Sequence, residues 1–246
     1  MRSFRTFSWK DTHLKVYSNE FQLITASIVH ERKKIEKYIK QHPAFASALK
    51  PINLLPEAPP VVQKMAEASG KTGLGPMASV AGTLAQYGVE AALEAGCTDA
   101  LVENGGDMYI ASSAPVTIGI YAGKNAIGTQ LAFHIFSEDL PLSICSSSSK
   151  MGHSLSFGNC ELATVIAKDA ALADSAATLV CNSISKQEDV EQVLDNVGSI
   201  EGIQGILVIK DNNVGLWGKL PQIVRNQDDE TVAKITRDPQ SELESD

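Results

Sequence analysis

The sequence lacks the cysteine spacings and apolar runs that mark several common classes of protein. Its four cysteines, Cys97, Cys145, Cys160 and Cys181, include no C-x-x-C pair, so the usual zinc and redox motifs are missing and free thiols are expected. No apolar run approaches the roughly 18 residues of a membrane span, and the first residues lack the apolar stretch of a secretory signal. We therefore expect a cytoplasmic protein that does not cross a membrane.

Basic residues and common nucleotide-binding motifs are scarce as well. The 21 Lys and Arg residues are outnumbered by 29 Asp and Glu residues, and the resulting net charge of −8 argues against a nucleic-acid partner. The sequence contains neither the G-x-S-x-G of many hydrolases nor the G-x-x-x-x-G-K-[ST] of a P-loop, and Gly73-Leu74-Gly75-Pro76 lacks the third glycine of a dinucleotide fingerprint. Any site must therefore be built from other groups.

The patterning that is present predicts an α+β fold. With 246 residues, 43% of them hydrophobic, the chain can bury a sizeable core. Short β-branched runs separated by glycine or polar turns indicate antiparallel sheets with packed helices, in a single domain over 1–220 followed by a polar, flexible tail over 221–246. We expect helices at 31–41, 61–69, 77–95, 169–182 and 187–196, and strands at 12–17, 21–26, 100–103, 108–111, 116–121, 131–136, 142–145, 162–167, 206–209 and 214–217.

The helix expected at 77–95 is unusually rich in Ala and Gly. Small side chains let another backbone or a ligand approach closely. The pattern indicates tight helix packing, and it also allows self-association as a homodimer, the commonest assembly of soluble oligomers.

A carboxylate and a hydroxyl share one face of the helix expected at 169–182. Asp174 and Thr178 are four residues apart, so their side chains lie on the same side. Carboxylate and hydroxyl oxygens suit Mg²⁺ or Ca²⁺, and a carboxylate buried among alanines needs a partner. The alternative is an exposed Asp in an early helical turn, favoured by the helix dipole, and both interpretations stay open at this point.

Two further segments are candidates for ligand binding, each with a plainer alternative. Glu103-Asn104-Gly105-Gly106-Asp107 ends a strand, and its glycines allow close approach of a phosphate or a flavin edge or form a simple hairpin turn. The loop from Ser146 to Ser154 offers hydroxyls, a lysine and His153, which suit phosphate binding and proton transfer. It is equally typical of a solvated loop.

Three segments resemble the ApbE family, whose best-known members are Mg²⁺-dependent FAD:protein FMN transferases. Residues 101–107, LVENGGD, are similar to the family's V-N-x-G-G-D/E, and residues 82–90, GTLAQYGVE, to its G-I-A-K-G-Y-A-V-D. The most specific match is 163–178, ATVIAKDAALADSAAT, with V-T-V-I-A-x-x-A-x-x-A-D-A-x-A-T. The resemblance implies a T-fold-like architecture and assigns Asp174 and Thr178 to Mg²⁺.

The chain departs from the family pattern at two places. The lysine of G-I-A-K-G is Ala85 and the following glycine is Gln86, while the H-x-I-D-P-x-T-G segment is reduced to residues 153–158 without Asp-Pro. The whole chain looks like a smaller ApbE-like branch, with shared segments that include Gly75-Pro76-Met77-Ala78. The fold is therefore expected to carry over more securely than the transferase activity.

On this basis we expect a protein that binds a flavin nucleotide, FAD or FMN, or a related phosphorylated ligand together with Mg²⁺. Transfer of FMN to an acceptor protein is one possible reaction, with His153 as the proton-transfer residue. The alternatives are a non-catalytic binding module and an enzyme acting on another small anionic metabolite. The residues assigned to the ligand are Gly75, Met77, Glu103, Asn104, Gly105, Gly106, Asp107, Ser146, Ser147 and Ser148.

Overall fold

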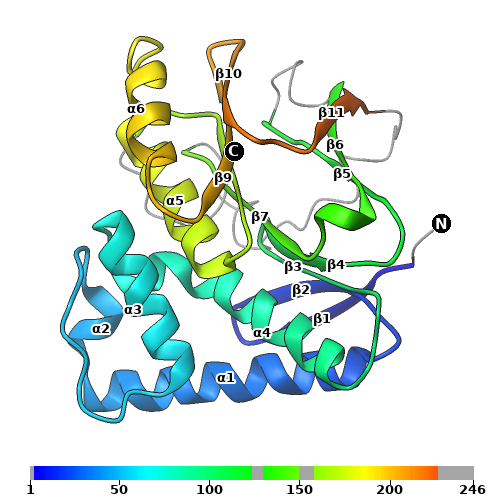
Figure 1. The fold of residues 1–246 in the computed structure, drawn as a ribbon. Coiled ribbons are helices and arrows are strands. Elements are labelled where there is room, and N and C mark those ends of the chain that lie inside the picture. Colours follow the sequence, from blue (N-terminus) through cyan, green and yellow to red (C-terminus); the bar gives the residue numbers. More distant parts are fainter. Residues whose placement is uncertain (1–2, 124–129, 150–157, 227–246) are drawn as a thin grey trace, which may run out of the picture.

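The computed structural model describes residues 3–123, 130–149 and 158–226 (Figure 1). An eight-stranded sheet runs through its centre, in the order β1-β2-β3-β4-β7-β8-β9-β10. Every neighbouring pair in this sheet is antiparallel, as the sequence predicts. Its strands are β1 (Arg5–Trp9), β2 (Thr12–Tyr17), β3 (Ala100–Asn104), β4 (Asp107–Ala111), β7 (Leu142–Ser147), β8 (Leu162–Ala167), β9 (Ile203–Lys210) and β10 (Asn213–Gly218).

Helices cover one face of the large sheet, and a small sheet covers the other (Figure 1). The small sheet has the order β11-β6-β5, formed by Gln222–Arg225, Leu131–Ile135 and Val116–Gly119. The fold class expected from the sequence, α+β with antiparallel sheets and packed helices, is confirmed. The helices are α1 (Phe21–Gln41), α2 (Ala44–Ser47), α3 (Pro60–Thr72), α4 (Val80–Glu94), α5 (Ala170–Ser183) and α6 (Asp189–Gly198), with short 3₁₀ turns at Pro76–Ser79 and Ser137–Asp139.

Alternation along the strands assigns each side chain to one of these two faces. In β3, Val102 packs in the core beneath α1 and α4, whereas Leu101 packs in the core between the two sheets. The neighbouring strand continues both rows, because Val102 lies opposite Tyr109 and Leu101 opposite Ile110. Both faces of the sheet are thus buried, and the side on which a residue lies can be read from its register.

Helix α4 lies at the centre of the helical layer, where its glycines let neighbouring helices approach. A side chain on Gly88 would meet Ile28 of α1, and one on Gly82 would meet the start of α5. The interpretation of tight packing is therefore confirmed, and the small residues of α4 that suggested self-association contact helices of the same chain. Gly96, with φ of 88°, follows the helix as predicted.

The strand predicted at 21–26 is wrong, since these residues form the first turns of α1. Their β-branched and aromatic side chains favour a strand locally, but Ile24 begins a helical stripe that continues through Ile28 and Ile35 to Tyr38, all buried. Burial of this stripe against α3 and α4 outweighs the weak strand propensity of the segment.

The helix predicted at 31–41 extends back to Phe21 as α1, and the remaining predicted elements are present with ends shifted by a few residues. The predicted helix at 77–95 begins as the 3₁₀ turn Pro76–Ser79 and becomes α-helical at Val80. Residues 222–225 form β11, paired with β6, although the polar tail was expected from 221. The division into a domain over 1–220 and a tail stays a prediction. Within the described residues, no helix has the length and apolarity that crossing a membrane requires.

Candidate active site

Two buried carboxylates meet where α4 begins, and they come from distant parts of the chain. Asp107 opens β4 on the helix-facing side, and Asp174 lies one turn inside α5. They are 7% and 8% exposed. Asp174 Oδ2 accepts a hydrogen bond of 2.8 Å from the amide of Gly82, and Asp107 Oδ1 accepts one of 3.3 Å from the amide of Ser146. In the described part of the chain, neither carboxylate has an ion-pair partner.

Burial without a counter-ion makes both groups poor acids. Loss of water raises the pKa of Asp174 to about 7, although hydrogen bonds from the amides of Gly82 and Ala81 act in the opposite direction. Burial, followed by the nearby charge of Asp174, raises the pKa of Asp107 well above its usual range. Two like charges held close together in a dry site favour either a bound proton or a bound cation.

The thiol of Cys145 belongs to the same cluster. It is fully buried on β7, with Asp107 within hydrogen-bonding reach and Ser143 Oγ 3.2 Å away. Burial, together with the charges of Asp107 and Asp174, raises the pKa of this thiol far above its usual value. Cys145 is therefore a neutral neighbour of the carboxylates. The sequence offered one signal for it, since strand alternation places Cys145 and Ser143 on the side opposite Ile144.

A side chain of each of the helices α4 and α5 accepts a hydrogen bond from a backbone amide in the first turn of the other helix. Asp174 of α5 accepts from Gly82 of α4, while Gln86 Oε1 of α4 accepts at 2.8 Å from the amide of Ala170, the first residue of α5. Gln86 Nε2 also donates to Glu90 Oε1 at 2.6 Å. Each helix thus satisfies amides that its own turns leave free. The Asp174 carboxylate is positioned by this crossing, and sequence reasoning missed the part played by Gln86.

The two positions that depart from the family's lysine-glycine pair lie at this crossing. Ala85 is 0% exposed, with its side chain in the core beneath α1 and α4. A lysine there would bury its ammonium group, which is costly without a partner. Gln86 in turn is occupied by Ala170 and Glu90. Ala85 therefore packs in the core, and Gln86 links α4 to the start of α5.

The Gly105-Gly106 segment is a tight hairpin turn between β3 and β4. Gly105 and Gly106 have φ of 65° and 104°. Positive φ at both central residues is what a type I′ two-residue hairpin turn requires. The turn brings Asn104 and Asp107 opposite each other on the helix-facing side, and Asn104 Nδ2 donates to the carbonyl of Ala81 at 3.1 Å. The turn therefore borders the carboxylate pair, while a role for its amides in ligand binding stays a prediction.

The structure separates several residues that the sequence grouped together. Glu103 and Ser146 lie on the face directed toward the small sheet, where Ser146 Oγ is 2.9 Å from Thr164 Oγ1. Ser147 alternates back to the helix-facing side, and Ser148 is buried. One face of the strand ends therefore carries Asn104, Asp107 and Ser147, and the other carries Glu103 and Ser146.

The remaining predicted site residues lie at varied distances from the pair. Thr178 is half-buried one turn beyond Asp174 on the same side of α5. Gly75 is a packing position, because a side chain there would be 1.7 Å from the carbonyl oxygen of Ala48. Met77 is half-buried against the core beneath α4. His153 lies outside the described residues.

A metal ion would need more than the acidic side chains of this cluster. Among residues 3–123, 130–149 and 158–226, no three His, Cys, Asp or Glu side chains are placed to hold an ion by themselves. Mg²⁺ commonly takes one or two carboxylates and completes its six ligands with water and substrate phosphate oxygens. The carboxylate pair, with the hydroxyl of Thr178 on the same helix face, fits that pattern.

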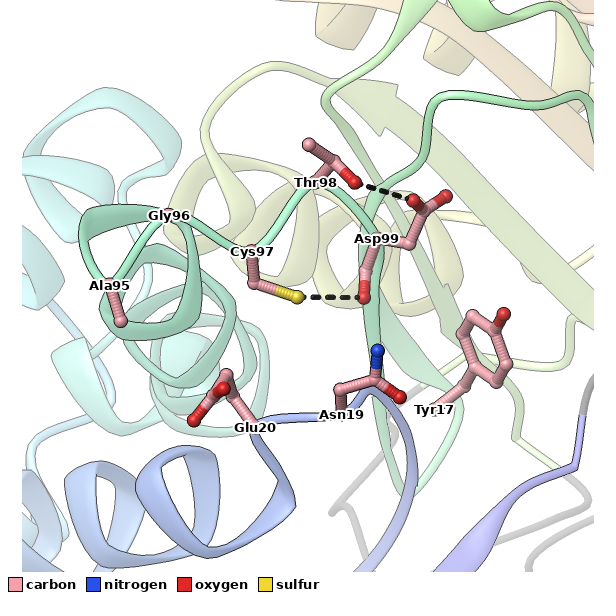
Figure 2. Close-up of a pocket in the computed structure, with 8 residues that line it drawn as sticks. All are labelled: Tyr17, Asn19, Glu20, Ala95, Gly96, Cys97, Thr98 and Asp99. Atoms are coloured by element: carbon pink, nitrogen blue, oxygen red, sulfur yellow. Dashed lines mark hydrogen bonds between the residues drawn. The ribbon is translucent and has the colours of Figure 1, made fainter.

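A separate cavity of about 350 Å³ lies at the other end of α4 (Figure 2). Ala95, Gly96 and Cys97 line it together with Tyr17 and Asp99. The Asp99 carboxylate already accepts hydrogen bonds from Thr98, Ser112 and Ser113, which lower its pKa to about 2. The Asp99 carboxylate is therefore engaged in hydrogen bonds that stabilise the loop around Ser112 and Ser113. Neither Asp107 nor Asp174 lines this cavity.

Gly82 is expected to be the least replaceable residue of the helix crossing. The side-chain carbon of a Gly82→Ala variant would lie 2.6 Å from the Ala170 carbonyl oxygen and 2.9 Å from Asp174 Cβ. We expect the free energy of unfolding, measured in urea, to fall by about 1–3 kcal/mol. Gly70→Ala in α3 is the matched control, because nothing lies within 4 Å of the added carbon. It should raise stability by roughly 0.5–1 kcal/mol. Equal effects of the two changes would contradict the close crossing.

Comparison with known proteins places the chain among relatives of similar length. A UPF0280 protein of Methanococcoides burtonii is 38% identical over 223 residues, covering 89% of this chain and 94% of the relative. A UPF0280 protein of Methanocella arvoryzae is 37% identical and covers 96% of both chains.

Solved structures share the fold at low sequence identity. The flavin transferase ApbE from Vibrio cholerae superposes with a TM-score of 0.57 at 10% identity, covering 88% of this chain and 96% of that one. The ApbE protein from Thermotoga maritima gives a TM-score of 0.55 at 16% identity, covering 97% and 100%. The profile of the family described as AbpE bacteria matches residues 6–210. The resemblance drawn from the sequence is thereby confirmed: the chain belongs to this family, within the ApbE-like superfamily, together with the UPF0280 proteins.

Proposed function

We propose that this protein binds a flavin nucleotide, or a related ligand with a pyrophosphate group, together with Mg²⁺ at the Asp107–Asp174 pair. The observation that carries the proposal is the burial of two carboxylates without a cationic partner in the described residues. A buried charge without a partner is costly, and a divalent cation would compensate both. The fold shared with the flavin transferase from Vibrio cholerae supports a flavin nucleotide as the ligand.

The residues around the pair have separate roles in this proposal. Asp174, Asp107 and the hydroxyl of Thr178 would hold Mg²⁺, which would neutralise phosphate charge when bound. The Asn104-Gly105-Gly106 turn and Ser147 border the same side of the sheet and would position the ligand. Asp174 keeps its orientation through the amide of Gly82, so the site is shaped before a ligand arrives. His153 stays our candidate for proton transfer.

FMN transfer to an acceptor protein is the reaction we propose first. Binding without turnover is the second candidate, favoured by one observation. The positions of the family's lysine and glycine hold a core alanine and a glutamine that braces α5, so neither contributes a free polar group to a ligand. An acceptor protein and a cytoplasmic location belong to the proposal on the sequence arguments alone. The homodimer stays a prediction, although Gly82 and Gly88 of α4 pack against α5 and α1 of the same chain.

Titration calorimetry of the metal-stripped protein tests ligand and metal together. We expect FAD to bind with Mg²⁺ present and to lose roughly 100-fold or more in affinity without it, since the pyrophosphate charge would then enter an acidic site without a cation to neutralise it. Riboflavin is the matched control, because it has the same ring system without phosphate and should show no dependence on Mg²⁺. ADP reports on the pyrophosphate alone. Absence of FAD binding in both conditions would reject the flavin assignment, and equal binding in both would reject the metal.

A further inference from the structure

The hairpin of β9 and β10 leaves one edge of the large sheet open. Strand β10 is the last strand in the sheet order, and among the described residues no strand pairs with its outer side. Helix α6 covers one face of β10, where a side chain added at Gly215 would meet Val190 and where Trp217 packs against Gly198 (Figure 1). The strand is therefore held in place by α6 while its edge stays available for pairing.

The backbone groups along this edge belong to Val214 and Leu216. The turn at 211–212 has φ of 48° and 61°, and a two-residue turn of this type joins Lys210 and Asn213 by hydrogen bonding. Hydrogen-bonded pairs alternate along an antiparallel ladder, so every second residue from Asn213 bonds to β9. The amides and carbonyls of Val214 and Leu216 therefore point away from β9, into the open edge.

The side chains along this edge are apolar and include no charge. Val214 and Leu216 continue a row of β9 residues that is buried between the two sheets, yet they stay 39% and 51% exposed. Residues 213–218, NVGLWG, contain no charged side chain, whereas β1 at the opposite edge of the sheet begins with Arg5. Charged side chains keep an edge strand from pairing with another chain, and β10 lacks that protection.

We propose that β10 is the docking surface for a second copy of this chain, whose own β10 pairs with it antiparallel about a two-fold axis at Gly215. This register sets Val214 of each copy opposite Leu216 of the other. Each such pair exchanges its outward N–H···O hydrogen bonds across the interface, and its two apolar side chains lie side by side. Eight strands from each copy then form one continuous sheet.

Charges beyond the two ends of β10 favour a second copy as the occupant. In the same register, Asp211 of one copy lies opposite Lys219 of the other. These side chains are 59% and 81% exposed, although each has a partner within its own chain, Lys210 and Asp139 respectively. The two-fold axis repeats the contact at the other end, so one strand supplies both members of a complementary pair. A shift of the partner strand by two residues, the smallest that keeps the hydrogen bonds, would set Asp211 opposite an uncharged residue.

The inference does not depend on the proposed function, because β10 contains no residue assigned to the ligand or the metal. It gives the homodimer expected from the sequence a different surface. The glycines of α4 that suggested self-association pack against helices of the same chain, whereas the edge of β10 faces outward.

Sedimentation equilibrium of the full chain over a range of protein concentrations tests the dimer. We expect the weight-average mass to rise with concentration from 26.3 kDa toward twice that value. Leu216→Pro should weaken the dimer roughly tenfold or more, because it removes an amide that bonds only across the interface. Lys219→Glu should weaken it as well, since Asp211 of the other copy would then face a like charge. Leu49→Ser, which removes an exposed leucine from a loop, is the control and should match wild type.

Amide hydrogen exchange of the wild-type protein tests the same surface without any substitution. The amides of Val214 and Leu216 should exchange more slowly as the protein concentration increases. Three results would overturn the proposal. The first is a monomer at every concentration with both amides unprotected, and the second is a dimer that Leu216→Pro leaves intact. The third is protection that does not vary with concentration, which would show that another part of the same chain occupies the edge.

Discussion

Asp174→Asn is expected to lower the affinity for FAD with Mg²⁺ at least roughly 100-fold, because losing one charged partner of a buried ionic contact costs about 3–5 kcal/mol. The amide oxygen of Asn can still accept the hydrogen bond that Gly82 donates to Asp174. The change therefore removes the charge and keeps the contact between α4 and α5. Calorimetric titration of the metal-stripped variant with FAD, with and without Mg²⁺, measures the loss.

Asp169→Asn is the matched control for this experiment. Asp169 caps the same helix through the amide of Leu172 and pairs with Lys64 on the surface, away from the carboxylate pair. Its replacement also removes one negative charge from the start of α5, yet it should leave the affinity for FAD and Mg²⁺ within about threefold of wild type, as screened surface charges contribute little. Equal losses in the two variants would show that net charge, and not the buried site, governs binding.

The second large effect concerns the stability of the metal-free protein as a function of pH. The pKa of Asp174 is raised from 3.8 to about 7 in the folded state, so folding favours the protonated carboxyl. Its contribution to stability is therefore complete below about pH 4, is lost as the pH rises toward 7, and is absent above 7. The free energy of unfolding of wild type relative to Asp174→Asn should fall by on the order of 4 kcal/mol across this range.

Urea unfolding of both proteins at pH 4, 5.5, 7 and 8.5 in the presence of a chelator measures this difference. Saturating Mg²⁺ should restore the stability of wild type at pH 8.5 and have little effect at pH 4, because the ion binds the ionised carboxylates. The same addition should leave Asp174→Asn unchanged at both values. A difference between the two proteins that does not vary with pH would contradict an Asp174 pKa near 7.

Local signals were sufficient to predict many of the elements. Strand β8 has the predicted bounds, and Asp169 caps α5 as expected, because a β-branched run and a capping carboxylate act over a few neighbouring residues. The first turns of α1 could not be recognised in the same way. Ile24 and Thr25 favour a strand by themselves, and only packing against α4 determines that they are helical.

The site was predicted in part, for reasons that follow from the register of the sheet. Asp107 and Asp174 were both identified, but their meeting depends on how α5 crosses α4 at Gly82, which no local pattern describes. The opposite orientations of Glu103 and Asn104 follow from strand alternation alone and could have been predicted. Gln86 was recognised only as a departure from a motif, because its partner Ala170 is distant in the sequence.

The reciprocal bonds at the α4–α5 crossing bear on how relatives of this protein should be compared. Asp174 holds the first turn of α4 whether or not an ion is present, so selection for folding alone would retain an acceptor at this position. An aspartate there is consequently a weak marker of metal chemistry in a relative. The hydroxyl of Thr178 enters our proposal only as a ligand of the ion. If the proposed metal site is correct, a relative that keeps the aspartate and lacks the threonine would retain the architecture without the ion.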